Sequence, residues 1–139
     1  MSVGLYTFPE PTIKCLRTLR FGSARARSPQ ARIFEILAVD MTVVEQSPGE
    51  LYSTLDDLAD ALPGNSPRYI LLSYPMVLPD GRQKTPFVML YYRPVTATQQ
   101  AKMLYAGAVE LVRSTADVNK LIEIEEENEI LEVERLLME

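Results

Sequence analysis

The first clear pattern in the sequence is an apolar stripe with helical spacing, formed by Ile13, Leu16 and Leu19. Thr12 precedes the stripe and is a good N-cap residue, so the pattern predicts a helix over 12–21. The opposite side of this helix carries only cations: Lys14, Arg17 and Arg20. A helix of this kind packs its apolar side on a core and leaves its cations in solvent.

Four strands are predicted from runs of branched and aromatic residues. Ile33–Val39 predicts a strand that Asp40 turns into a second strand, Met41–Glu45. Tyr69–Tyr74 and Phe87–Tyr92 are continuous apolar or aromatic runs, joined by a segment with a Pro-Asp-Gly turn signal. These two runs predict a hairpin with a long loop.

The segment between the two hairpins has a full set of helix start signals. Ser47 is a good N-cap residue, Pro48 suits the first helical position, and Glu50 closes a capping box. One apolar stripe follows at helical spacing: Leu51, Leu55, Leu58 and Leu62. We therefore predict a helix that starts at Ser47 and stops before Pro63.

A long helix after the second hairpin has two different faces. Thr96–Gln99 supply a capping box, and the pattern predicts a helix from there to about Arg113. Its apolar face comprises Ala101, Leu104, Tyr105, Ala108, Leu111 and Val112. Its outer face comprises Gln99, Gln100, Lys102, Met103, Ala106, Gly107 and Glu110. Met103 with Gly107 one turn later places an exposed thioether beside a gap that a partner's surface can enter.

The C-terminal segment completes the predicted fold. Lys120–Ile124 predicts a strand, and a glutamate-rich amphipathic helix follows, with Ile130, Val133 and Leu137 on its apolar side. The order is then helix, hairpin, helix, hairpin, helix, strand, helix. This order predicts an α/β (α+β) fold, a single domain over 1–139, in which a mixed sheet of about five to six strands has helices on both faces.

Composition narrows the function classes more than it narrows the fold. The chain of 139 residues is 47% hydrophobic, which is enough for one core. It has no histidine and one cysteine, Cys15, which removes Ser-His-Asp and Cys-His catalysis and the commonest metal ligand. We therefore expect no cofactor and no metal site. An enzyme of this composition would depend on carboxylate, lysine or tyrosine chemistry.

The sequence carries no signal for secretion or for a membrane. The first ~30 residues lack a signal-peptide pattern, no apolar run is long enough to cross a bilayer, and a lone cysteine suits a reducing compartment. The net charge of -5 disfavours a nucleic-acid partner. We therefore expect a cytoplasmic protein without a membrane or nucleic-acid partner.

Charge is segregated along the chain. Six cations and no acid lie within Pro11–Arg32, and six acids and no cation lie within Asp40–Asp60. Glu123–Glu139 contains eight glutamates and one cation. A dipolar surface of this kind steers a protein partner better than it holds a polyanion. The same blocks are compatible with ordinary solvated faces, so the pattern leaves both interpretations open.

Several motifs resemble those of one family of actin-regulatory proteins. In the second half of the chain they are Pro67-Arg68-Tyr69-Ile70, Ser73-Tyr74, Asp80-Gly81-Arg82, Gln99-Gln100 and Lys102-Met103-Leu104-Tyr105-Ala106-Gly107. These motifs resemble the core signature of the actin-depolymerising-factor homology (ADF-H) domain and, more narrowly, of glia maturation factor. Motifs near the N-terminus resemble fungal members: Leu5-Tyr6-Thr7-Phe8, Leu16-Arg17 with Leu19-Arg20, and Ser28-Pro29-Gln30-Ala31.

The resemblance implies a gelsolin-like fold and a non-enzymatic role in the actin cytoskeleton. Glia maturation factors bind the actin-related protein 2/3 (Arp2/3) complex, inhibit nucleation and remove filament branches, with weak or no binding to actin alone. The resemblance thus implies this partner, a monomer, and a place at cortical actin patches, with the nucleus as a second location. Cofilin-like members sever filaments, and their long helix continues with serines and a lysine where this sequence has Gly107-Ala108-Val109-Glu110. This difference favours glia maturation factor.

The resemblance also implies a set of partner-binding residues. ADF-H proteins insert the long helix into the hydrophobic cleft between two lobes of an actin-like fold, so Met103 would be the apolar anchor. The full set is Lys14, Arg17, Arg20, Gln99, Lys102, Met103 and Gly107. Asp80 and Arg82 at the hairpin turn form a candidate second contact patch for the first actin subunit of a daughter filament. Ser2 is a candidate phosphorylation site.

Each candidate residue also has an ordinary structural explanation. An exposed methionine, a packing glycine, solvated cations and a satisfied Asp-Gly turn need no partner. A cofilin-like actin-binding protein stays as an alternative function. An enzyme with paired carboxylates, Asp56 with Asp57 or Glu125 with Glu126, is a further one. Neighbouring residues on a helix point about 100° apart, and no polar pocket signal accompanies either pair, so the sequence disfavours it.

Overall fold

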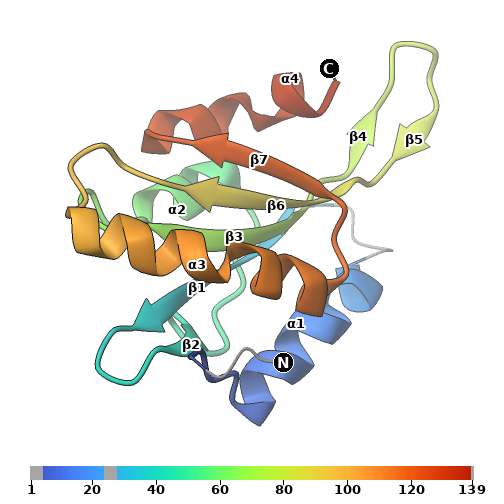
Figure 1. The fold of residues 1–139 in the computed structure, drawn as a ribbon. Helices are drawn as coiled ribbons and strands as arrows, with labels where there is room; N and C mark the ends of the chain where they lie inside the picture. Colours follow the sequence, from blue (N-terminus) through green and yellow to red (C-terminus); the bar gives the residue numbers. More distant parts are fainter. Residues whose placement is uncertain (1–4, 24–27, 139) are drawn as a thin grey trace.

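A mixed five-stranded sheet forms the centre of the protein (Figure 1). The computed structural model describes residues 5–23 and 28–138, with the side chains of residues 20–23 outside that description. The strands are β1 (Gln30–Leu37), β2 (Thr42–Glu45), β3 (Arg68–Ser73), β6 (Phe87–Tyr92) and β7 (Lys120–Ile124). Their order is β2-β1-β3-β6-β7, and neighbours pair antiparallel except β6 and β7, which are parallel.

Helices cover both faces of the sheet and give the protein three layers (Figure 1). One face carries α1 (Glu10–Ser23) and α3 (Gln99–Ala116); the other carries α2 (Leu55–Asp60), the 3₁₀ helix η1 (Glu127–Glu132) and α4 (Val133–Met138). A hydrophobic core lies on each face of the sheet. Because side chains alternate along a strand, each central strand contributes side chains to both cores. Tyr69 and Leu71 of β3 face α1 and α3, whereas Ile70 and Leu72 face α2 and α4, and all four are fully buried.

A small second sheet projects from the main one. β4 (Met76–Val77) and β5 (Gln83–Lys84) pair antiparallel and extend the loop between β3 and β6 into solvent (Figure 1). Gly81 at the turn has a φ of +92°, a conformation that favours glycine. The turn carries Asp80 and Arg82 on either side of this glycine.

The predicted fold class is confirmed. Helices and hairpins follow one another in the predicted order, the sheet is mixed, and helices lie on both faces. β7 has the predicted bounds, and the C-terminal helical segment buries Ile130, Val133 and Leu137 as its apolar pattern indicated. No helix within residues 5–23 and 28–138 is both long and apolar enough to cross a membrane.

The helix predicted from Ser47 is wrong in its start and its length. α2 begins only at Leu55, where the Thr54 hydroxyl accepts a hydrogen bond from the first turn at 3.1 Å. Gly49 has a φ of +83°, which is outside the right-handed helical region. Tyr52 exchanges two backbone hydrogen bonds of 2.9 Å with β1, beside the part of β1 that β2 does not reach. This pairing with the sheet keeps the segment before Thr54 out of a helix.

Two of the predicted helix caps also differ from those in the structure. α1 begins at Glu10, so Thr12 lies inside its first turn, where the buried hydroxyl donates to a backbone oxygen of β2 at 2.8 Å. Thr98, and not Thr96, caps α3, because its side chain accepts the backbone hydrogen bond of the first turn at 3.1 Å. The Thr96 hydroxyl instead donates to the loop between α2 and β3 at 2.8 Å. Both threonines bond a segment that is distant in sequence, which a local pattern does not show.

Because several tyrosines are buried, we predict that the protein is less stable to unfolding at alkaline pH. Burial raises the pKa of Tyr69 and of Tyr92 above the ordinary tyrosine value of about 10. Above that pH the unfolded chain loses protons that the folded protein keeps, so the free energy of unfolding falls as the pH rises. We expect a lower urea midpoint at about pH 11 than at about pH 8.5, with a smaller difference in Tyr69→Phe. A midpoint that does not change over this range would contradict the burial of these hydroxyls.

Candidate partner-binding site

Helix α3 is anchored so that one of its sides faces solvent. It continues past the predicted end at Arg113 to Ala116. Its buried side packs on the sheet through Tyr105, Ala108, Val112 and Ala116. Met103 lies on the opposite side, and its side chain is 66% exposed. The apolar side of α3 is therefore used by the core, while Met103 has no core to pack on.

Two tyrosines hold α3 on the sheet. The Tyr105 hydroxyl accepts a hydrogen bond from the backbone N–H of Ile36 at 2.9 Å, where β1 extends beyond its pairing with β3. The Tyr69 hydroxyl of β3 donates to the carbonyl oxygen of Tyr105. Both tyrosine side chains are buried, with ring centroids 5.4 Å apart. These protected hydrogen bonds fix the position of α3 relative to the sheet.

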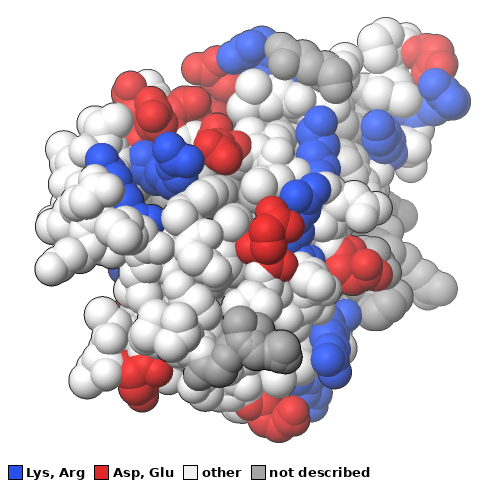
Figure 2. Space-filling view, viewed as in Figure 1, with Lys and Arg blue, Asp and Glu red and all other residues white. Residues whose placement is uncertain are grey.

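Met103 has an uncharged and a charged neighbour on the first half of α3. Figure 2 shows mainly uncharged residues along α3, with Lys, Arg, Asp and Glu atoms above its start and over its second half. Gln99, one turn earlier, is exposed. Lys102 is half-buried, and its Nζ donates to the carbonyl oxygen of Val95 at 3.2 Å. The structure therefore brings Gln99, Lys102 and Met103 together on the first half of α3.

The gap predicted beside Gly107 is filled by the N-terminal segment of the chain. The Tyr6 hydroxyl donates to the carbonyl oxygen of Leu104 at 2.9 Å. A Cβ atom at position 107 would lie 2.3 Å from the Tyr6 hydroxyl oxygen, so only glycine leaves room for it. Two backbone hydrogen bonds of 2.9 Å tie Thr7 to the β2 edge and keep Tyr6 in place. The prediction of an open gap is therefore wrong, although Gly107 itself remains exposed beside Tyr6.

Gly107→Ala is expected to act differently with and without Tyr6. Alanine favours a helix over glycine by about 0.5–1 kcal/mol, but its Cβ displaces the Tyr6 hydroxyl. We expect little or no gain in the free energy of unfolding in the wild type and a gain of about 0.5–1 kcal/mol in a Tyr6→Ala background. Urea unfolding of the four proteins measures both effects. Equal gains in the two backgrounds would show that Tyr6 does not occupy this position.

Helix α1 adds a basic strip to the same face of the sheet. Lys14 and Arg17 are exposed and form no ion pair within the described part of the chain. Figure 2 shows Lys and Arg atoms at the lower right, where α1 lies. The backbone of Arg20 continues the helix, but its side chain lies outside the described residues. Arg32 is not part of this free strip, because it pairs with Glu45 at 3.1 Å.

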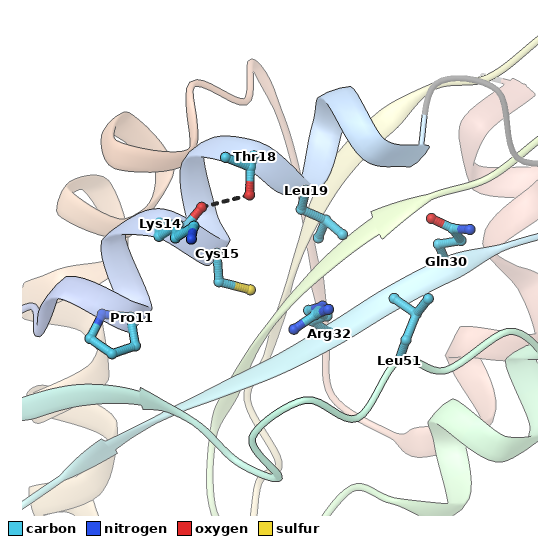
Figure 3. A pocket seen from close by; sticks show the side chains of 8 residues that line it. All are labelled: Pro11, Lys14, Cys15, Thr18, Leu19, Gln30, Arg32 and Leu51. Carbon is cyan, nitrogen blue, oxygen red and sulfur yellow. Dashed lines mark hydrogen bonds between the residues drawn. The ribbon is translucent and has the colours of Figure 1, made fainter.

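A hollow of about 440 Å³ lies between α1 and β1 (Figure 3). It is lined by Pro11, Lys14, Cys15, Thr18, Leu19, Gln30, Arg32 and Leu51. The sulfur of Cys15 points from α1 toward β1 (Figure 3). Burial raises the pKa of Cys15 and outweighs the opposite effect of Arg32, so the thiol stays protonated and weakly reactive. Sequence spacing did not indicate this hollow, because its walls come from three separate segments.

The hairpin turn holds Asp80 and Arg82 away from the α3 surface. Arg82 Nε donates to Asp80 Oδ2 at 2.7 Å, and the Arg82 backbone N–H donates to Asp80 Oδ1 at 3.1 Å. Both side chains are mainly exposed, and together they satisfy the turn. The hairpin projects at the opposite end of the molecule from the start of α3 (Figure 1). These two residues therefore form a patch of their own.

The remaining candidates do not assemble into a reactive site. Ser2 lies outside the described residues. Asp56 with Asp57, and Glu125 with Glu126, are exposed to solvent. An exposed carboxylate lacks the environment that prepares a group for acid–base work. Among the described residues, no group of three or more His, Cys, Asp or Glu side chains is placed to hold a metal ion.

Comparison with known proteins assigns the family. Residues 17–137 match the sequence profile of the cofilin/tropomyosin-type actin-binding proteins. The chain belongs to this family. It is 36% identical over 126 residues to Protein AIM7 of Saccharomyces cerevisiae, and that alignment covers 86% of this chain and 85% of the relative.

Similarity to glia maturation factors is found in both sequence and structure. The chain is 33% identical over 79 residues to glia maturation factor of Drosophila melanogaster, which is 57% of each protein. The solution structure of glia maturation factor from Caenorhabditis elegans matches with a TM-score of 0.73 at 25% identity, over 96% of this chain and 97% of that one. The resemblance stated from the motifs is thus confirmed, and the chain is an actin-regulatory ADF-H protein of the glia maturation factor type.

Proposed function

We propose that this ADF-H protein binds the Arp2/3 complex, inhibits actin nucleation and promotes debranching of actin filaments, without catalysing a reaction. The observation that carries this proposal is Met103, an apolar side chain 66% exposed on a helix that the core holds in place. A rigid helix with one exposed apolar anchor suits insertion into the hydrophobic cleft of an actin-related subunit, because little conformational entropy is lost on binding. Gln99 and Lys102 flank the anchor.

The basic strip on α1 supports the same partner. Lys14 and Arg17 are exposed without an acidic partner in the described residues, and α1 packs beside α3 on one face of the sheet. Cations in this position attract an acidic surface and orient it before the anchor is buried. Arg20 extends the strip by its place in the helix.

A second contact explains how a binder of the complex also removes a branch. We place it at Asp80 and Arg82, on the turn that projects from the body of the protein. This turn would meet the first actin subunit of the daughter filament while α3 holds the complex. The protein would then act as a monomer at the junction, at cortical actin patches and in the nucleus.

Cofilin-like binding to the actin filament is the second candidate, and the surface of α3 argues against it. Glu110 is exposed on the solvent side and pairs with Arg113 at 3.5 Å. An acid at this place repels an acidic filament surface, whereas cofilin-like members have cations after the same tyrosine-alanine pair. Cosedimentation with actin filaments, run beside a binding assay with the purified Arp2/3 complex, separates the two functions. Strong filament binding and severing would overturn the proposal.

Arg17→Glu is expected to slow association with the Arp2/3 complex by about tenfold at low salt and to change the dissociation rate little. The reason is that an exposed cation acts mainly during the encounter, and salt screens its effect. Stopped-flow or surface-based kinetics at two salt concentrations measure the rates. Lys120→Glu, the same change at an exposed lysine on β7, is the control and should affect association much less. Equal effects of the two changes would remove α1 from the binding surface.

A further inference from the structure

The hollow between α1 and β1 combines cations with apolar side chains (Figure 3). Among the described residues that line it, none is acidic. Lys14 comes from α1 and Arg32 from β1, so a cation stands on each of the two facing elements. The volume of about 440 Å³ lies in the range of pockets that hold small ligands. The hollow therefore suits an occupant that carries negative charge.

Arg32 has a hydrogen-bond donor that its own chain leaves without a partner. Its Nη1 donates to the two carboxylate oxygens of Glu45 at 3.1 and 3.3 Å. Its Nε is buried and has no hydrogen-bond partner within the described residues. A buried donor without a partner is costly, and native proteins contain few of them. The side chain as a whole is 27% exposed, so a carboxylate in the hollow can bring an acceptor to the guanidinium group.

Lys14 supplies the positive charge that the ion pair does not. Glu45 neutralises Arg32, whereas Lys14 is exposed and forms no ion pair within the described part of the chain. A carboxylate carries a single negative charge and matches this balance. A phosphate group carries about two, and its second charge would lie near Glu45, which repels it. The charges of the hollow therefore favour a carboxylate over a phosphate.

Apolar side chains surround the two cations. Pro11 and Leu51 line the hollow and are exposed, Leu51 to 38%. Leu19 is buried and Cys15 is half-buried in the same lining. An apolar group next to the carboxylate would cover these side chains and exclude water from the charged contact, which strengthens the attraction. The lining thus fits an acidic side chain that has an apolar side chain as its neighbour.

We propose that this hollow binds an acidic peptide segment of a partner protein. A glutamate or aspartate side chain of the segment meets Lys14 and Arg32, and an apolar side chain beside it covers Leu51. Of the residues assigned above to the Arp2/3 complex, this site uses Lys14 alone, and no residue of α3 lines it. The inference therefore goes beyond the proposed function and does not depend on it.

Fluorescence anisotropy with a synthetic peptide tests the assignment on the full chain, without the Arp2/3 complex or actin. The probe is a short labelled peptide of alternating glutamate and leucine, blocked at both ends. We expect it to bind at least about tenfold more tightly than the same peptide with glutamine in place of glutamate. Equal binding of the two peptides would overturn the inference.

Two cations of α1 provide a matched pair of variants. Lys14→Gln should weaken binding of the acidic peptide about tenfold, because it removes a charged donor from the hollow. Arg17→Gln removes the same charge from the same helix but does not touch this hollow, and should bind within about threefold of the wild type. Equal losses in the two variants would show only a general attraction to α1 and would overturn the inference. Thermal unfolding of both variants checks that the fold is kept.

Cys15 reports whether the peptide lies in the hollow. It is the single cysteine of the chain, and it lines this hollow. A saturating concentration of the acidic peptide should slow its labelling by N-ethylmaleimide at least about fivefold, because the occupant restricts access to the thiol. Mass spectrometry measures the labelling rate. Labelling as fast with the peptide as without it would place the peptide elsewhere and overturn the inference.

Inorganic phosphate tests the preference for a carboxylate. At equal ionic strength, phosphate should displace the acidic peptide no better than chloride does. Displacement by phosphate at about tenfold lower concentration than chloride would overturn the assignment of a carboxylate site. Failure of the wild-type protein to bind the Arp2/3 complex would overturn the proposed function and leave this inference in place.

Discussion

Met103→Ala is expected to weaken binding of the protein to the purified Arp2/3 complex by at least about 30-fold, which corresponds to about 2 kcal/mol. The side chain is 66% exposed on a helix that Tyr105 and Tyr69 hold on the sheet, so its burial in a partner's cleft costs little ordering of the protein. Fluorescence anisotropy measures the change in affinity: labelled wild-type protein is bound to the complex, and unlabelled Met103→Ala or wild type is added as the competitor.

A matched control for this variant is available on the other face of the sheet. Leu131 of η1 is 49% exposed, and its replacement by alanine removes a similar apolar side chain from a helix surface that the proposal does not use. Leu131→Ala should bind like the wild type, and neither variant should change the free energy of unfolding by more than about 0.5 kcal/mol. If Met103→Ala binds as well as Leu131→Ala, Met103 is an ordinary exposed methionine.

Tyr105→Phe is expected to lower the free energy of unfolding by about 2 kcal/mol. The Tyr105 hydroxyl accepts the hydrogen bond of the Ile36 backbone N–H at 2.9 Å, in a part of β1 that β3 does not pair. Phenylalanine fills the same space but leaves this buried N–H without a partner, and an unsatisfied buried donor is costly. Urea unfolding followed by circular dichroism measures the difference.

Tyr91→Phe is the matched control for the loss of a tyrosine hydroxyl. Tyr91 is a buried residue in the same core, and its hydroxyl makes no hydrogen bond within the residues that the structure describes. We expect its replacement to change the free energy of unfolding by less than about 0.5 kcal/mol. Equal losses in the two variants would mean that the bond to Ile36 does not hold α3 on the sheet.

The periodic parts of the fold could be predicted from the sequence, because the type and spacing of their apolar residues indicate them. β6 and β7 are recognisable as runs of branched and aromatic residues, and α3 as a long stripe at helical spacing. The helix start at Ser47 was wrong because a local signal competed with a distant one. Tyr52 pairs with β1, and the energy of that pairing outweighs a capping box that the local sequence favours.

Only the part of the candidate site that lies on α3 could be predicted from the sequence. The spacing of α3 places Met103 opposite the buried face, which the structure bears out. The occupant of the space beside Gly107 could not be predicted, because Tyr6 is distant in sequence and reaches α3 by crossing the β2 edge. The hydrogen bond of Lys102 to the Val95 carbonyl oxygen could not be predicted either, since a pattern of charges does not show which lysine bonds a backbone carbonyl.

The lifetime of filament branches tests the central claim most directly. Branched actin networks are assembled with the Arp2/3 complex, and single branches are followed by fluorescence microscopy after the purified protein is added. We predict that branch lifetime shortens as the protein concentration rises and that Met103→Ala requires at least about 30-fold more protein for the same effect. Branch lifetimes that stay unchanged at a saturating concentration of the wild-type protein would contradict the account.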